Sequence, residues 1–583
     1  MLRIANASGF WGDRLGAVEE MVRGGPIDVL TGDYLAELSM AILHKSRLKD
    51  PRAGFVPTFL RQLEGVLGEC LDKKIRVVTN AGGLNPRGLA EAIDRLAQKL
   101  GLHPRVAYVE GDDLTARLDE LARAGEPLAH LDHGTPLESA PGEVLTANAY
   151  LGGWGIREAL ARGADLVVCP RVTDAALAVG PSAWRFDWRR DDWDRLAGAV
   201  AAGHILECGA QATGGNYAFF DEVRDWRRLG FPIAEMHEDG SFVITKHPNT
   251  GGLVNAGTVT AQLLYEIQGA RYANPDVVAR FDSLRLVEEG PDRVRVEGAR
   301  GEPAPRTAKV AINYAGGFRN SMTILLGGLD LERKARIVEE MLFDELGGKA
   351  QYAAVDVRLQ RMDREHPRSN EEALAYLRVT VMSPDAELVG RRFASRVVEL
   401  ALSTVPGFSS RTPPGDAQPY LVYWPALVDA RQLRERVIFE GETIAIAPAP
   451  GGSTEDAPAI APPSIALPPP PSGETVRVPL GRAFGARSGD KGGNANLGVW
   501  ARTPAAFAFL REWLTVERLK SLLPDVAPFP IERDDLPNLL ALNFYIRGLL
   551  GEGVASSARS DPQAKTLGEY FRAVHADLPR AIL

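Results

Sequence analysis

Two short polar runs carry the residue types of a reaction centre. The first, Cys169-Pro-Arg-Val-Thr-Asp174, places a thiol, a guanidinium, a hydroxyl and a carboxylate within six residues. The second, 204–216, holds an imidazole, a carboxylate at Glu207, a second thiol at Cys208 and a pair of glycines. Imidazoles and carboxylates can move protons, and a thiolate can act as a nucleophile. We expect the two runs to face one cleft.

Four side chains of these runs are candidates for catalysis. Arg171 can bind a carboxylate or phosphate through two parallel hydrogen bonds. Asp174 and His204 can supply acid–base chemistry, and Cys169 precedes a predicted helix whose N-terminus would lower the pKa of a thiol. Other interpretations stay open, because cysteine is often buried and inert, His204 can bond the backbone, and Arg171 can pair only with Asp174.

A wider set of polar residues is expected to bind substrate, because each follows a predicted strand or lies in a glycine-rich turn. Its members are Asp13, Asp33, Asn80, Asn85, Asp112, Gln211, Gly214, Gly215 and Asn216, and near the C-terminus Arg487, Asp490, Lys491 and Asn494. The backbone of Gly214 and Gly215 could stabilise an oxyanion, and the C-terminal set could form an anion-binding nest. An Asp or Asn before a helix is also a favoured cap, and the C-terminal set could be a solvent-facing turn.

These side chains require a scaffold of alternating strands and helices. Predicted strands end just before polar turns at 2–6, 27–30, 75–78, 106–109 and 166–168, and a predicted helix follows each turn. Such alternation indicates βαβ units and a mostly parallel sheet. The carboxyl ends of parallel strands meet at one edge, where ligands bind in α/β folds.

The length of 583 residues predicts about three domains. We expect an α/β, Rossmann-like, substrate-binding domain at 1–280 and an α+β domain at 281–444. The Pro- and Ala-rich stretch 445–475 is expected to be a linker, because it cannot bury enough apolar surface to fold alone. A small α+β domain is expected at 476–583.

Composition excludes several classes of function. The formal net charge of −9 supplies no basic field for nucleic acid, and no apolar run approaches the length of a membrane span. Three cysteines without CxxC spacing argue against a disulfide framework and favour a reducing compartment. We therefore expect a cytoplasmic protein without nucleic-acid or membrane partners. The size of the chain, separately, leads us to expect a homo-oligomer.

Cofactor motifs are absent from the sequence. It contains no GxGxxG after the first strand, no GxxxxGK[ST], no HExxH and no EF-hand loop, so dinucleotide, P-loop, zinc and calcium sites lack support. Magnesium remains possible, because carboxylates that gather at the sheet edge would suit it. The candidate ligands are Asp13, Asp33, Asp112, Asp113 and Asp174.

Several long motifs resemble one family. Ser8-Gly-Phe-Trp-Gly-Asp13, the run 79–86, Cys169–Asp174 and the run 209–216 resemble the acyclic terpene utilisation protein A family, and 486–496 resembles its appended ferredoxin-like domain. The resemblance implies a role in the breakdown of citronellol- and geraniol-type compounds through acyl-CoA intermediates. It also implies an acyl or acyl-CoA substrate, with CoA as part of that substrate.

The first hypothesis is an enzyme with lyase, hydratase or hydrolase chemistry on a branched or terpenoid acyl substrate. The second is a non-catalytic binding or scaffold subunit that associates with acyl-CoA carboxylase or hydratase enzymes. A nucleotide-dependent ligase is a third hypothesis, against which the missing phosphate loop argues. A closed polar cleft with converging charges would favour the enzyme over the scaffold.

Overall fold

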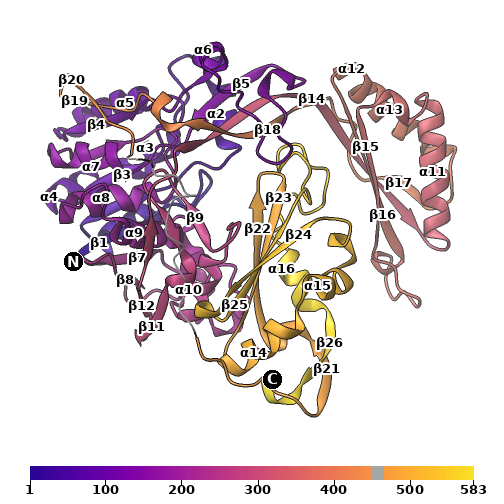
Figure 1. The fold of residues 1–583 in the computed structure, drawn as a ribbon. Helices are drawn as coiled ribbons and strands as arrows, with labels where there is room; N and C mark the ends of the chain where they lie inside the picture. The colour runs from indigo at the N-terminus through magenta and orange to yellow at the C-terminus, as the bar shows by residue number, and fades with distance from the viewer. Residues whose placement is uncertain (450, 452–464) are drawn as a thin grey trace.

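The fold was analysed in a computed structural model, which describes residues 1–449, 451 and 465–583. Figure 1 shows a large α/β body, an arm that projects from it, and a C-terminal domain that lies between the two. The expected linker at 445–475 falls partly outside the described residues. No helix of the described chain is long and apolar enough to cross a membrane.

The large body is built on an eleven-stranded sheet. Its centre consists of five parallel strands in the order β1 (Leu2–Asn6), β2 (Val29–Gly32), β3 (Arg76–Thr79), β6 (Leu166–Val168) and β4 (Val106–Glu110). Antiparallel strands extend one side as β7 (Pro232–Met236), β8 (Phe242–Lys246), β12 (Arg293–Glu297) and β11 (Arg285–Gly290), and the other as β19 (Arg436–Phe439) and β20 (Glu442–Ala445). The predicted parallel arrangement thus holds for the centre, whereas the flanks are antiparallel.

Helices cover both faces of this sheet, because the buried central strands are apolar on both sides. One core lies beneath α1 (Ala17–Arg23), α3 (Pro57–Glu64) and α5 (Pro86–Leu100). The other lies beneath α7 (Trp154–Ala161), α8 (Ala176–Phe186) and α9 (Trp193–Leu206). Helix α7 begins at Trp154, and residues 144–149 before it pair as a strand, β5, with the second sheet.

The second sheet is organised by one long strand, β14 (Thr307–Gly327). It pairs with β18 (Gln418–Asp429), β16 (Leu374–Ser383) and β5 (Val144–Ala149), and carries α11 (Leu331–Glu345) and α13 (Arg391–Glu399) on the arm (Figure 1). Strands 285–297 and 436–445 belong to the first sheet and β5 to the second. The expected boundary at residue 280 therefore does not coincide with the end of a sheet.

The C-terminal domain has a four-stranded antiparallel sheet in the order β22 (Phe484–Lys491), β23 (Asn494–Ala501), β25 (Ala541–Ile546) and β24 (Ile531–Leu536). Helices α14 (Pro504–Trp513), α15 (Val516–Leu522) and α16 (Leu567–Ala573) pack against it around a separate core. Its hairpin β22–β23 docks on the large body, where Asn496 donates from Nδ2 to the carbonyl of Leu264 at 2.6 Å. The hairpin thereby reaches the carboxyl edge of the parallel strands within the same chain.

Candidate active site between the domains

A cavity of about 520 Å³ lies between the large body, the second sheet and the C-terminal hairpin, and residues from all three line it. Its wall includes four basic side chains, which are those of Arg271, Lys309, Lys491 and Arg547, and two acidic ones, those of Asp132 and Asp174. The wall is therefore more basic than acidic, although the whole chain carries a net charge of −9. We name this space the interdomain cleft.

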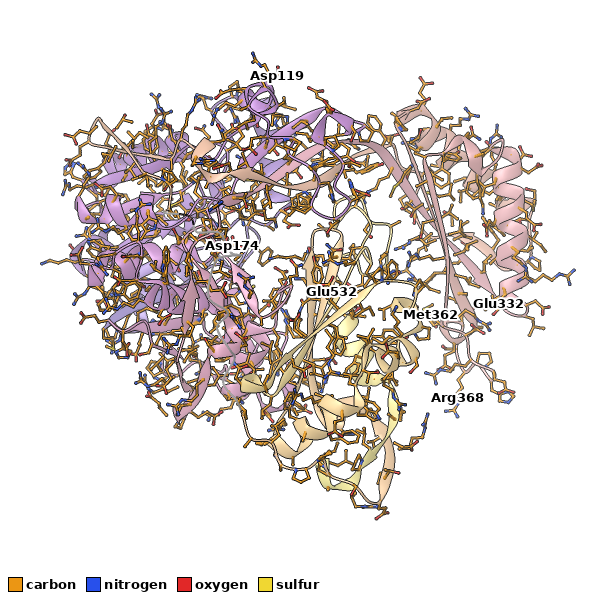
Figure 2. The ribbon with its side chains drawn as sticks, viewed as in Figure 1. Asp119, Asp174, Glu332, Met362, Arg368 and Glu532 are labelled. Carbon is orange, nitrogen blue, oxygen red and sulfur yellow. The ribbon has the colours of Figure 1, made fainter. Side chains whose placement is uncertain are left out.

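Asp174 is one of two residues of the first polar run that reach the cleft, and the other is Thr173. Its side chain is 31 % exposed, whereas that of Arg171 is 4 % exposed. Arg171 Nη2 donates to Asp174 Oδ1 at 2.8 Å, and Nη1 donates to the carbonyl of Leu35 at 2.8 Å. In Figure 2 Asp174 lies on the side of the large body that is turned toward the C-terminal domain. Arg171 therefore holds Asp174 and, contrary to expectation, does not line the cleft itself.

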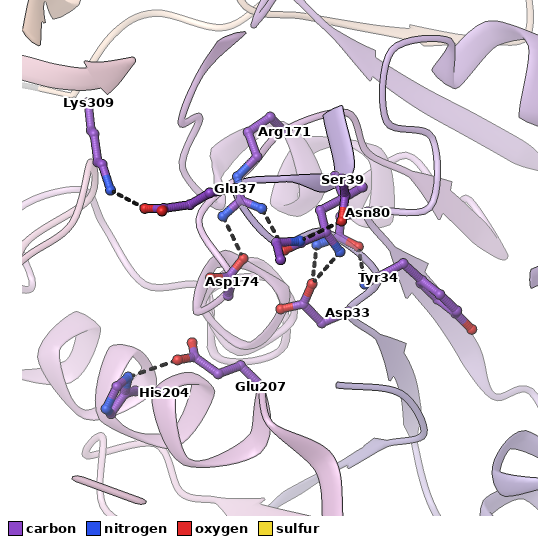
Figure 3. A network of polar contacts seen from close by, with 12 residues as sticks. Asp33, Tyr34, Glu37, Ser39, Asn80, Arg171, Asp174, His204, Glu207 and Lys309 are labelled. Carbon is purple, nitrogen blue, oxygen red and sulfur yellow. Dashed lines mark hydrogen bonds and ion pairs between the residues drawn. The ribbon is translucent and has the colours of Figure 1, made fainter. Parts of the chain in front are cut away.

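A second buried acid lies behind this pair. Asp33 follows β2, and its Oδ1 accepts a hydrogen bond from Asn80 Nδ2, at the end of β3, at 2.6 Å. Burial and the charge of Asp174 raise the pKa of Asp33 well above its usual range, although the Arg171 charge acts in the opposite direction. Asp33 is 4 % exposed and Asn80 is fully buried. Their hydrogen bond, which Figure 3 shows, therefore joins the ends of two strands in the interior of the protein.

The second polar run contributes another buried pair. His204 lies in the last turn of α9, with Nδ1 3.0 Å from Glu207 Oε1, and the two atoms are not aligned as a hydrogen bond. Burial lowers the pKa of His204 to about 4 and raises that of Glu207 well above its usual range. His204 is therefore uncharged at pH 7, and burial favours the protonated form of Glu207. Glu207 and Asp174 line one small cavity, so the two runs do converge.

The C-terminal hairpin places a cation opposite these acids. Lys491 lines the cleft at the end of β22, with Nζ 5.7 Å from the centre of the Tyr272 ring. Burial raises the pKa of Glu207 and that of Glu266, the latter to about 8. The positive charge of Lys491 acts against both increases. Within the described residues Lys491 forms no ion pair, whereas Lys309 lies 3.3 Å from Glu37 Oε1. Lys491 is therefore available to an anion.

The model of the family described as acyclic terpene utilisation family protein AtuA matches residues 2–439, and that of the AtuA ferredoxin-like domain matches residues 478–576. The chain belongs to the acyclic terpene utilisation family. The family assignment and the C-terminal domain expected from the sequence motifs are thereby confirmed. No curated protein and no solved structure matches the chain in the same comparisons.

Several predicted site residues of this AtuA-family chain have structural contacts instead. Cys169 is fully buried, and burial raises the pKa of its thiol, as it does for Cys208. A thiol that keeps its proton is a poor nucleophile. The expectation of a lowered Cys169 pKa is wrong, because the apolar core outweighs the nearby helix N-terminus. His204 likewise does not line the cleft, since Tyr272 and Phe281 cover its ring.

Other expected ligands stabilise turns. Asp13 accepts hydrogen bonds from the N–H groups of Gly9 and Arg14, and Asn85 caps α5 by accepting from the N–H of Gly88. The N–H groups of Gly214 and Gly215 donate to Gln211 and Ala210 within their own turn. They are therefore not free for an oxyanion. Asn216 adopts a φ of 56° in the same turn, which Asn tolerates better than most residues.

The remaining candidates join neighbouring elements. Asp112 accepts from Asn148 Nδ2 at 2.8 Å and from the N–H of Arg171 at 3.3 Å, and burial raises its pKa to about 7. Gln211 accepts a hydrogen bond from Arg487. These contacts hold the strand ends and the hairpin in place around the cleft.

The C-terminal motif forms paired strands instead of a nest, and two of its four candidates reach the cleft. Asn494 lines the cleft and donates from Nδ2 to Asp132 Oδ1 at 2.8 Å. Lys491 also lines the cleft, and within the described residues its ammonium group forms no ion pair. Arg487 is buried, and Asp490 lies 3.8 Å from Lys565. The strand pairing from Lys491↔Asn494 onward uses the backbone groups that a nest would have offered.

The five expected magnesium ligands do not form one group, although Asp33 and Asp174 line the same small cavity as Glu207. Within the described residues, the ligand-type side chains that converge within 4.8 Å are those of His130, His133 and Glu552, and none of the five aspartates belongs to that group. The strand-end aspartates instead point to separate hydrogen-bond partners, as described for Asp13, Asp33 and Asp112.

Much of the wall of the cleft consists of residues that belong to none of the sequence motifs. Arg271 and Tyr272 belong to β9 (Arg271–Ala273), Lys309 to β14, and Arg547 follows β25. Thr173, from the first polar run, also lines the cleft, and within the described residues its buried Oγ1 has no hydrogen-bond partner. A carboxylate, an unpaired ammonium group and a free hydroxyl can together bind an anionic acyl group and transfer a proton.

Proposed function

We propose that the chain is an enzyme of acyclic terpene utilisation that binds an anionic acyl substrate in the interdomain cleft and transfers a proton. The observation that carries this proposal is the basic wall of the cleft opposite the fixed carboxylate of Asp174. The family supplies the metabolic context, and the wall supplies the reason to expect an anion. A CoA thioester, which carries phosphates, is the proposed form of the substrate.

The size of the cleft suits this class of ligand. Small-molecule sites typically span roughly 300 to 1,000 Å³, and the cleft has about 520 Å³. Tyr150, Tyr272 and Tyr423 supply apolar surface for an aliphatic chain. Lys309 and Lys491 would attract the anionic groups of the substrate, and Thr173 would donate to a carbonyl oxygen.

Asp174 is proposed as the proton acceptor. The Arg171 guanidinium fixes its orientation through one carboxylate oxygen, and the side chain lines the cleft. Lys491 would stabilise negative charge that develops on the substrate after the proton leaves. Since neither buried thiol is suited to nucleophilic attack, lyase or hydratase chemistry is favoured over hydrolysis through a thioester to the enzyme.

The decisive experiment combines ligand binding with proton exchange. Purified protein is incubated in D₂O with geranyl-CoA and with branched acyl-CoA thioesters, and deuterium uptake into the acyl group is followed by mass spectrometry. We expect one thioester to raise the melting temperature and to gain deuterium. Asp174→Asn should abolish the exchange and retain the binding, whereas the exposed control Asp119→Asn should retain both.

Two outcomes would overturn this proposal. Melting shifts with free nucleotides alone would favour a ligase. If no thioester binds and an acyl-CoA carboxylase or hydratase co-purifies with the chain, the scaffold hypothesis would be favoured over the enzyme hypothesis. Light scattering on the same sample measures whether the chain is a homo-oligomer.

A further inference from the structure

A second group of reactive side chains lies at the seam between the large body and the C-terminal domain. His130 and His133 come from the loop between α6 (Leu118–Arg123) and β5, and Glu552 comes from the loop after β25. One donor atom from each residue lies within 4.8 Å of the others. His130 is buried, whereas His133 and Glu552 are exposed.

The two imidazoles pack against each other and against one tryptophan. Their rings stack with centres 3.7 Å apart and an angle of 11° between the planes. Both rings meet the face or edge of Trp424 at near right angles, at 5.0 Å for His130 and 5.4 Å for His133. The N–H of Leu131 donates to the carbonyl of Pro425 at 2.9 Å and anchors the loop between them.

Two neighbouring contacts bring the carboxylate to this pair. Asn494 Nδ2, at the hairpin, donates to Asp132 Oδ1 at 2.8 Å, and the N–H of Leu550 donates to the carbonyl of Gly493 at 2.9 Å. The loop that carries Glu552 is thus tied to the hairpin, and the hairpin is tied to the histidine loop. The convergence of the three side chains therefore follows from the docking of the C-terminal domain.

We propose that His130, His133 and Glu552 bind one divalent transition-metal ion of the zinc class. Imidazole nitrogen and carboxylate oxygen are ligands that Zn²⁺ and Co²⁺ accept, and Mg²⁺ prefers an oxygen-only set. Donor atoms around a tetrahedral zinc ion lie roughly 3.4 Å apart for bonds of about 2.1 Å. An imidazole nitrogen binds an ion that lies in the plane of its ring, so the His133 ring must rotate out of its stack on His130 to share one ion with it. His133 and Glu552 are exposed, which leaves both side chains room to move.

The hydrogen bonds of the histidines must change when the ion binds. Nδ1 of His130 accepts from the N–H of Asp132 at 3.1 Å, and Nδ1 of His133 lies 2.7 Å from Thr135 Oγ1. A metal bound at Nε2 of His130 would leave the ring proton on Nδ1, which then could not accept from Asp132, and a metal bound at Nδ1 would replace that contact. Binding therefore breaks the His130–Asp132 hydrogen bond in either tautomer.

The position of the ion gives it a role that does not depend on the reaction in the cleft. Three protein ligands leave a fourth position open for water or a ligand atom. Leu131 and Asp132, between the two histidines, line the cleft, so this open position lies beside its wall. The ion would also join the C-terminal domain to the large body, and its binding should raise the melting temperature.

The test uses full-length protein stripped with a chelator and then titrated with Zn²⁺ by calorimetry, and with Co²⁺ by absorption. We expect one equivalent to bind, with a Co²⁺ spectrum of low coordination number and no competition from Mg²⁺. His133→Ala and Glu552→Gln should each weaken binding at least tenfold, and both side chains are exposed, so the variants should fold. His103→Ala and His366→Ala are matched exposed controls.

Equal affinity and stoichiometry in the wild type, His133→Ala and Glu552→Gln would overturn the site and leave adventitious binding. The absence of Zn²⁺ binding to the stripped wild type would also overturn it. Circular dichroism of each variant separates a lost ligand from a lost fold. Because the readout is metal binding, failure here is independent of the proton-exchange experiment.

Discussion

The carboxyl edge of the parallel strands and the basic wall of the cleft differ in what their charges contact. At the strand edge, Arg171, Asp33 and Asn80 are buried and bind one another or the backbone. In the wall, Lys491 and Asn494 face a cavity that is open to a ligand. The motif-rich edge thus builds the support for one carboxylate, Asp174, and the wall supplies the surface that would select the substrate.

The largest expected effect comes from the strand edge. Arg171→Met removes the guanidinium that pairs with Asp174 and leaves buried acids without their cation. Breaking a fully buried ion pair costs about 3–5 kcal/mol. Because the Asp174 side chain is 31 % exposed, this is the upper bound on the expected fall in the free energy of unfolding in urea. Arg547→Met, in the wall, should change stability little. Equal losses for the two variants would remove the distinction between edge and wall.

A large but different effect is expected in the wall. Lys491→Met removes the unpaired ammonium group of the cleft and should weaken binding of an anionic acyl thioester roughly 10- to 100-fold, because hydrogen bonds to charged groups contribute about 1.5–3 kcal/mol. Isothermal calorimetry measures the loss, and Lys45→Met is an exposed control. Unchanged affinity in Lys491→Met would show that the wall does not select by charge.

An intermediate effect is expected from pH. Asp112 has a folded-state pKa of about 7 against an ordinary value of 3.8, because burial disfavours its charge. The folded protein keeps this proton between about pH 4 and 7 while the unfolded chain releases it, so this group makes stability fall as pH rises through that window. Asp112→Asn should flatten the decline and gain on the order of 2 kcal/mol at pH 8.

Urea unfolding at a series of pH values between 4 and 8 measures this slope. The exposed variant Asp119→Asn should retain the wild-type profile. If the Asp112→Asn profile runs parallel to that of the wild type, Asp112 is already ionised in the folded protein at pH 4. Burial would then not have raised its pKa.

The strand edge was largely predictable from the sequence. Runs of three to five residues followed by polar turns locate β1, β2, β3, β4 and β6 within two residues, because local periodicity reports burial. The same reasoning brought Asp174 and the second run to one place. It failed for the burial of Cys169 and Arg171, since how deep a turn lies depends on the helices that later cover it.

Most of the wall was not predictable, although Asp174, Lys491 and Asn494 were among the sequence candidates, because its other residues meet only through tertiary structure. Arg271, Lys309 and Arg547 lie in or beside ordinary strands of three different sheets, and nothing in their local sequence distinguishes them. Glu552 lies in a different domain from His130 and His133, so no ligand spacing of the usual zinc motifs joins them. Their convergence depends on how the C-terminal hairpin docks, which a local pattern does not encode.

The smallest expected effect tests whether the strand edge has a chemistry of its own. Cys169 stands between a buried strand and a helix, yet its thiol is fully buried and keeps its proton at neutral pH. Cys169→Ala should therefore cost only about 1 kcal/mol of stability, the typical effect of a core truncation of this size, and leave proton exchange intact. Iodoacetamide should not modify Cys169 in the folded protein, as peptide mass spectrometry would show. Rapid alkylation of Cys169 together with loss of proton exchange would contradict this prediction. It would mean that a thiolate at the strand edge takes part in the reaction as well as Asp174.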